Sequence, residues 1–159
     1  MAVIEATLCY LERDGRILML HRNRKNNDLH KGKYNGIGGK LEPGESPHDC
    51  VKREVLEESG YSVESFQFTG HITFPLFDGK NDWSVFLFTG SGIAGQMMEN
   101  PPEGGLEWVE RKSLLELNLW EGDYIFLPWV LEGRIFVARF DYRDGRYLRH
   151  DVQFAGTCN

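Results

Sequence analysis

The chain has 159 residues, of which 41% are hydrophobic and 26% are charged, and these values suit one globular domain spanning residues 1–159. Its net charge of −6 argues against a nucleic-acid polymer as ligand, but not against a single nucleotide held through metal ions. The three cysteines form no close pair, and no apolar run approaches the roughly 20 residues of a spanning helix. We therefore expect a soluble cytoplasmic protein without a membrane partner.

The first third of the chain predicts strands. Residues 3–11 and 17–20 are apolar runs on either side of Asp14-Gly15, which is a hairpin signal. A polar loop over residues 23–33 follows, and the glycine-rich run at residues 34–39 is interpreted as a strand.

The next segment predicts a capped helix. Ser46 can accept a hydrogen bond from a free N–H of the first turn, and Pro47 suits the first helical position. Gly60 supplies the left-handed residue that ends such a helix.

The second half of the chain predicts further strands and two shorter helices. Ser113 is a plausible cap for a helix to residue 119, and Asp123 or Gly122 opens another that ends near residue 132. Residues 91–105 are interpreted as a loop. The predicted strands cover residues 66–74, 83–89, 106–110, 135–142 and 146–154. Helices packed on a mixed sheet are the natural architecture for this order of elements.

The predicted helix carries three glutamates, Glu54, Glu57 and Glu58, at spacings of three and four residues. Their carboxylates therefore project from one face, which overlaps the side that carries Val51 and Val55. Like charges repel there, and near a core they would be costly to desolvate. A hard divalent cation relieves both problems, and Mg²⁺ prefers carboxylate oxygens and shares its coordination with substrate phosphates. For the glutamates alone, a solvated acidic face would be the better interpretation.

The surrounding residues resemble the signature of the Nudix hydrolase family, G-x5-E-x7-R-E-U-x-E-E-x-G-U, where U is aliphatic. The matching positions are Gly39, Glu45, Arg53, Glu54, Val55, Glu57, Glu58 and Gly60. Tyr61 departs from the aliphatic residue at the last position. The resemblance implies an α/β fold, specifically a Nudix-type α/β/α sandwich with a mixed β-sheet. It also implies hydrolysis of a nucleoside diphosphate linked to another moiety, with Mg²⁺ as cofactor and Mn²⁺ as a possible substitute.

By the same resemblance, Glu54, Glu57 and Glu58 are metal ligands, and one of them can act as a general base. The Gly38-Gly39 backbone can approach metal or phosphate closely, because no side chain intervenes. Glu45 and Arg53 are expected to support the site as a pair that fixes the loop against the helix; the alternative is a surface ion pair of little value.

Other segments resemble the 8-oxo-dGTP diphosphatase branch of the family. The run YNGIGGK at residues 34–40 is close to that branch's W-N-G-F-G-G-K, and its asparagine, which binds the purine, maps to Asn35. Trp120 and Asp123 match a W-x-x-D segment in which the tryptophan stacks on the base and the acid binds its edge. Glu103 stands where the branch has an extra glutamate near the metal, as a ligand or a water-activating group.

Three positions depart from that branch. Gly122 replaces a second aspartate, Tyr34 replaces the usual tryptophan, and Leu76 stands where the branch has a second pocket aromatic. Phe74 is a candidate for either the pocket wall or the core, and Arg22 is a candidate contact to phosphates or ribose.

Each of these residues also has a plainer interpretation. Asn35 can be a turn residue before Gly36, and Trp120 can fill the core. Asp123 can cap a helix, and Glu103 can be an exposed acid in a loop.

The combined pattern predicts a Mg²⁺-dependent nucleoside triphosphate pyrophosphohydrolase acting on oxidised purine nucleotides such as 8-oxo-dGTP. One alternative is another Nudix substrate such as ADP-ribose, because Pro75 lies near a position associated with those enzymes. Another is a nucleotide-binding sensor that does not hydrolyse its ligand, against which the intact set of glutamates argues.

Overall fold

The computed structural model describes residues 2–23 and 28–156 of the chain. Part of the predicted polar loop over residues 23–33, and also Cys158, lie outside the described residues. No helix in the described ranges is long and apolar enough to cross a membrane.

The described strands form one sheet of nine strands in the order β3-β2-β1-β6-β5-β8-β9, with β4 paired to β1 and β7 paired to β2. Two neighbouring pairs, β1 with β6 and β5 with β8, are parallel, and the other pairs are antiparallel. The predicted mixed sheet is therefore confirmed. The elements are β1 (Val3–Arg13), β2 (Arg16–Arg22), β3 (Tyr34–Asn35), β4 (Ile37–Lys40), α1 (Pro47–Ser59), β5 (Ser62–Phe74), β6 (Asp82–Ala94), β7 (Gly104–Glu110), the 3₁₀ helix η1 (Arg111–Glu116), α2 (Asp123–Leu131), β8 (Phe136–Arg143) and β9 (Arg146–Phe154).

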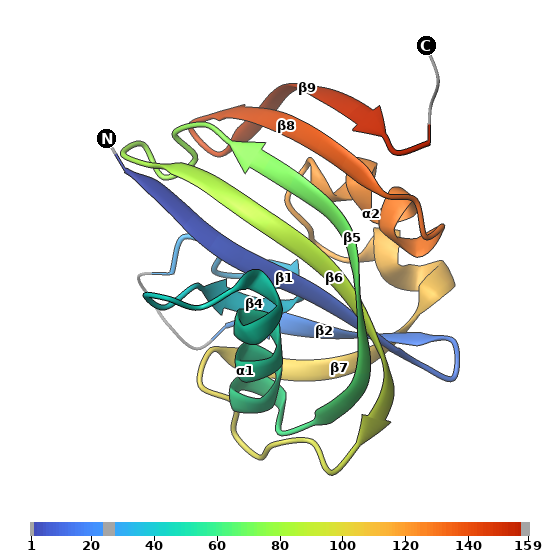
Figure 1. Cartoon of the computed structure of the whole chain (residues 1–159). Helices are drawn as coiled ribbons and strands as arrows, with labels where there is room; N and C mark the ends of the chain where they lie inside the picture. Colours follow the sequence, from blue (N-terminus) through green and yellow to red (C-terminus); the bar gives the residue numbers. More distant parts are fainter. Residues whose placement is uncertain (1, 24–27, 157–159) are drawn as a thin grey trace.

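Helices cover both faces of this sheet. Along β1, Cys9 packs into the core cluster that contains Val51 of α1. Its neighbour Tyr10 packs into a second core cluster that contains Phe126 of α2. Because successive side chains of a strand point to opposite faces, α1 and α2 lie on opposite sides of β1, as Figure 1 also shows. The expected α/β/α sandwich is confirmed.

The predicted strand at residues 34–39 is interrupted at Gly36. Asn35 pairs with Leu20 of β2, whereas Ile37 pairs with Cys9 of β1. A Cβ atom at Gly36 would lie 2.7 Å from the carbonyl oxygen of Cys9, so only glycine fits this crossing point. The short β3–β4 ribbon thus spans two strands, β1 and β2, that pair with each other only near their shared hairpin turn.

The ends of α1 agree with the sequence prediction. The Asp49 N–H donates to Ser46 Oγ at 3.1 Å, and Gly60, at φ 83°, donates its N–H to the carbonyl oxygen of Leu56 at 2.9 Å. These caps fix where the helix starts and stops, and hence which glutamates face the sheet.

Other boundaries differ from the prediction. Strand β6 continues through residues that were expected to form a loop, because its end pairs with the start of β5 at Ser62 and Ala94. The helix expected to start at Ser113 is the 3₁₀ helix η1, which starts at Arg111. Helix α2 begins after Gly122 without a side-chain cap, so the capping role considered for Asp123 is not observed.

Candidate active site

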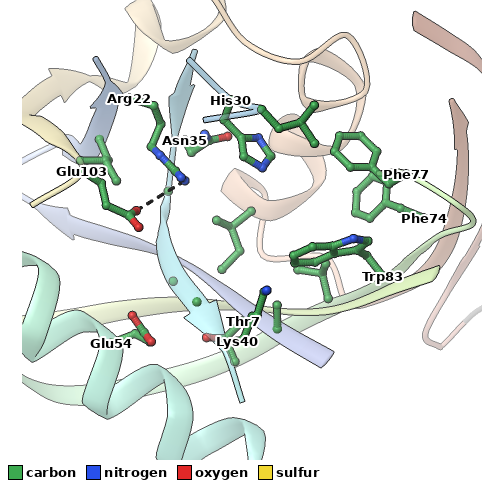
Figure 2. A pocket seen from close by; sticks show the side chains of 18 of the residues that line it. Thr7, Arg22, His30, Asn35, Lys40, Glu54, Phe74, Phe77, Trp83 and Glu103 are labelled. Carbon is green, nitrogen blue, oxygen red and sulfur yellow. Dashed lines mark ion pairs between the residues drawn. The ribbon is translucent and has the colours of Figure 1, made fainter. Parts of the chain in front are cut away.

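A cavity of about 810 Å³ opens beside the β3–β4 ribbon. Figure 2 shows two carboxylates, Glu54 and Glu103, on one side of it and the aromatic rings of Phe74, Phe77 and Trp83 on the other. The cavity therefore has an acidic end and an aromatic end. The lining includes eleven of the residues predicted from the sequence, namely Arg22, Asn35, Gly38, Gly39, Arg53, Glu54, Glu58, Phe74, Glu103, Trp120 and Asp123.

Glu54 is the buried glutamate of α1, with 9% of the residue exposed. A Cβ atom at Gly39 would lie 2.5 Å from its carboxyl carbon, so the glycine makes room for this carboxylate beside the ribbon. Burial raises the pKa of Glu54; the nearby charges of Glu57 and Glu103 raise it further, while Arg53 opposes them. The acidic end thus holds a desolvated carboxylate among other negative charges.

Arg53 ties the loop before α1 to the helix. Its Nε and Nη2 donate to the two carboxylate oxygens of Glu45 at 2.7 and 2.9 Å, and Nη2 also donates to the carbonyl oxygen of Lys40 at 3.1 Å. Nη1 donates to Glu54 at 2.8 Å. The hydrogen bonds from Arg53, together with one from the backbone N–H of Glu42, lower the pKa of Glu45 to about 2. A single guanidinium therefore joins the loop of the signature motif to its helix.

The remaining acidic candidates separate into two groups. Glu58 and Glu103 line the cavity, and Glu103 forms an ion pair with Arg22 at 3.6 Å. The Glu57 side chain is 55% exposed and accepts a hydrogen bond from Arg53 Nη1 at 3.1 Å. Within the described ranges, Glu57 is not among the residues that line the cavity.

The donor chemistry of the acidic end fits a hard divalent cation. Within residues 2–23 and 28–156, no three His, Cys, Asp or Glu side chains converge into a ready-made metal site. The carboxylates of Glu54, Glu58 and Glu103 nevertheless line one cavity, together with Gly38 and Gly39, which have no side chains to fill the space. Because a buried carboxylate beside like charges is unfavourable, a bound cation would stabilise this arrangement.

The aromatic end contains two buried polar side chains that were predicted to bind a base. Asn35 is 8% exposed, and its Nδ2 has no hydrogen-bond partner among the described residues. Asp123 is 7% exposed, and burial raises the pKa of its carboxyl to about 8, against a smaller opposing effect of Lys33. At neutral pH this carboxyl is therefore mainly protonated and can donate a hydrogen bond.

Aromatic rings surround these polar groups. Trp120 is 8% exposed, and its ring contacts the Phe77 ring edge-on with centroids 5.0 Å apart. Phe77 in turn contacts Phe74, with centroids 5.5 Å apart. Leu76, at the position of the branch's second pocket aromatic, is 49% exposed at φ 48°, so the next residue, Phe77, supplies the ring instead.

The glycine at position 122 also has a structural explanation. The Tyr142 hydroxyl accepts a hydrogen bond from the Gly122 N–H at 2.6 Å. A Cβ atom at Gly122 would lie only 2.7 Å from that hydroxyl oxygen. A phenol that lines the cavity thus occupies the space next to Asp123 where the related branch carries a second acid.

Sequence reasoning missed several residues of the cavity, among them His30, Lys40, Phe77 and Tyr142. His30 lies in a polar loop that contains no motif, and Phe77 lies next to a turn. Nothing in the neighbouring sequence therefore predicted that either side chain lines a cavity. Tyr142 comes from the last hairpin, and only the folded sheet brings it to Gly122.

Comparisons with known proteins show which family the chain belongs to. The NUDIX domain family profile matches residues 3–130. The oxidized purine nucleoside triphosphate hydrolase of Mus musculus is 33% identical over 113 residues, covering 71% of this chain and 72% of that protein. The protein of the same name from Danio rerio is 28% identical over 146 residues, covering 92% and 88%.

Among solved structures, a crystal structure of the mutator MutT protein from Bacillus halodurans superposes with a TM-score of 0.84. It is 30% identical, and the match covers 94% of this chain and 97% of that one. Because the family profile spans most of the chain and the fold agrees, the chain belongs to the Nudix hydrolase family.

Proposed function

We propose that the protein is a Mg²⁺-dependent nucleoside triphosphate pyrophosphohydrolase that acts on oxidised purine nucleotides such as 8-oxo-dGTP. One observation carries this proposal: a single cavity joins an acidic end, which suits metal-bound phosphates, to an aromatic end with buried polar groups, which suits a base. The names of the mouse and zebrafish relatives support the same substrate class.

The acidic end is the place for the triphosphate. Glu54, Glu57 and Glu58 would hold Mg²⁺, with the Gly38 carbonyl and Glu103 as further oxygen donors. When bound, the ion supplies positive charge that offsets the charge on the phosphates and the leaving group. Arg53 and Glu45 support this end by fixing the loop against α1.

Hydrolysis needs a carboxylate that accepts a proton from the attacking water. Glu58 and Glu103 are the best placed for this role because both line the cavity, whereas the exposed Glu57 contacts Arg53. Arg22 positions Glu103 through their ion pair and adds positive charge near the phosphates. The products are a nucleoside monophosphate and pyrophosphate.

The aromatic end is the place for the base. The unpartnered Nδ2 of Asn35 donates to an acceptor on the purine edge, and the protonated carboxyl of Asp123 donates to another. Trp120, Phe74 and Phe77 contact the faces or rim of the ring system, where aromatic contacts are favourable.

A substrate panel with Mg²⁺ tests the proposal. It holds 8-oxo-dGTP, 2-hydroxy-dATP, the ordinary nucleoside triphosphates and ADP-ribose, with wild type and Glu54→Gln assayed in parallel. We expect pyrophosphate release concentrated on the oxidised purines and lost in the variant. Turnover concentrated on ADP-ribose, which releases AMP and ribose phosphate, would contradict the substrate. Nucleotide binding without any turnover would instead identify a sensor.

A further inference from the structure

His30 is a cavity residue that neither the signature nor its flanking motifs include. It lies between β2 and β3, and its backbone N–H donates to Asp28 Oδ1 at 3.0 Å. The other oxygen of Asp28 accepts from Arg22 Nε at 2.8 Å, and the Asp28 side chain is only 6% exposed. Figure 2 shows the imidazole of His30 turned into the cavity. A buried carboxylate therefore fixes this histidine in place at the wall.

The contact with Trp120 determines which ring nitrogen of His30 carries the proton. The indole Nε1–H can only donate a hydrogen bond, and it lies 2.7 Å from His30 Nδ1. His30 Nδ1 must therefore be the acceptor, and in a neutral imidazole the proton then sits on Nε2. Burial, followed by the charge of Arg22, lowers the pKa of His30 to about 4, so the ring is neutral at physiological pH.

The resulting Nε2–H donor forms no hydrogen bond to any residue within the described ranges. Its surroundings suit a base better than a phosphate. The ring is uncharged, it stacks on Phe77 with centroids 6.0 Å apart and an interplanar angle of 17°, and Trp120 contacts its edge. The Nε2–H of a neutral imidazole that lies among aromatic rings is suited to donate to the edge of a planar heterocycle.

We propose that His30 is a specificity-determining residue, whose Nε2–H donates a hydrogen bond to a carbonyl oxygen of the substrate's base. This inference rests on the proposed function and narrows its substrate class. His30, Asn35 and Asp123 all present donors, so the cavity favours a base rich in carbonyl acceptors over one that has no carbonyl oxygen. Trp120 is then a positioning residue that fixes the tautomer of His30.

The test compares variants with and without a donor at position 30. His30→Phe and His30→Leu both remove the donor, so a folding failure of one leaves the other, whereas His30→Gln retains an N–H. The kcat/KM values are measured for 8-oxo-dGTP, for dGTP, which lacks the C8 carbonyl, and for the triphosphate of 2-aminopurine deoxyriboside, which lacks the C6 carbonyl.

We expect the apolar variants to lose about 10- to 100-fold in kcat/KM on 8-oxo-dGTP, the size of effect when a buried polar group loses its partner. The loss should be much smaller for an analogue that lacks the contacted acceptor, and His30→Gln should keep most of the activity. An equal loss on every nucleotide, or no loss, would overturn the proposal.

A second measurement is independent of turnover. Nitrogen-15 NMR of the imidazole distinguishes the two tautomers, and we expect wild type to show only the Nε2–H form. Trp120→Phe, which keeps an aromatic ring but removes the indole donor, should give a mixture. A wild-type ring protonated on Nδ1 would refute the assignment of the donor. Wild-type turnover across the panel tests the proposed function, whereas variant-to-wild-type ratios test His30, so the two can fail separately.

Discussion

At the scale of single residues, the ionised Glu54 carboxylate is unfavourable for folding, yet we propose that it is needed for hydrolysis. Burial raises the pKa of its carboxyl, so its stabilising contribution belongs to the protonated form and is lost as the pH rises through the folded-state pKa. Glu54→Gln should therefore leave the free energy of unfolding at neutral pH unchanged or increased.

The same substitution should lower the rate of pyrophosphate release about 100-fold or more, because several kcal/mol of charge stabilisation depend on bound metal. Glu116→Gln, an exposed control at the end of η1, should change neither quantity. Urea unfolding and a pyrophosphate assay measure the two effects. A Glu54→Gln protein that is less stable but fully active would reverse both expectations.

Asp123 gives a prediction about pH. Its pKa is raised to about 8, so its donor is present at neutral pH and is lost as the pH rises through that value. We expect kcat/KM on 8-oxo-dGTP to fall above about pH 8 in wild type. Asp123→Asn keeps an N–H donor that does not titrate, so this decline should disappear. If both proteins decline alike, another group is responsible.

The residue scale also shows the limit of local sequence signals. The caps at Ser46 and Gly60 were predictable because their hydrogen bonds stay within a few residues. Phe77 was not predictable, because the positive φ of Leu76 decides which of two neighbours faces the cavity. Nothing near His30 in the sequence predicted its place in the cavity wall, because its ring is held by a hydrogen bond from Trp120, 90 residues away in the sequence.

At the scale of elements, the β3–β4 ribbon determines where the cavity lies. Gly38 pairs with Leu8 of β1, and a Cβ atom there would overlap the carbonyl oxygen of Thr7. The sequence predicted a strand here, but the switch of partners at Gly36 depends on long-range pairing that no local pattern records. Close contact with the backbone of β1 therefore explains the glycines at positions 36 and 38.

Gly38→Ala should destabilise the fold by about 1–3 kcal/mol or more, because overlap with backbone cannot be relieved by a rotamer change. Gly105→Ala is the matched control, since a Cβ atom at this β7 glycine would meet no atom within 4 Å. Its effect should stay within about 0.5 kcal/mol. Chemical denaturation compares them, and equal stability of the two variants would show that the ribbon tolerates a side chain.

At the scale of the whole molecule, one sheet runs through both core clusters. Strand β1 contributes Cys9 to the cluster under α1 and Tyr10 to the cluster under α2. The expectation that residues 1–159 form a single domain stays a prediction. Because the clusters share a strand, we expect tryptophan fluorescence and far-ultraviolet circular dichroism to report one coincident unfolding transition. Two separate midpoints would divide the chain into independent units.

The proposed function requires that one cavity binds both ends of an oxidised purine nucleotide. A crystal structure of the protein with Mg²⁺ and the product 8-oxo-dGMP tests it most directly. We expect the base at the aromatic end, within hydrogen-bond distance of Asn35 and Asp123, and the phosphate near Glu54 and Glu103. A base bound at the acidic end, or a nucleotide bound outside this cavity, would contradict it.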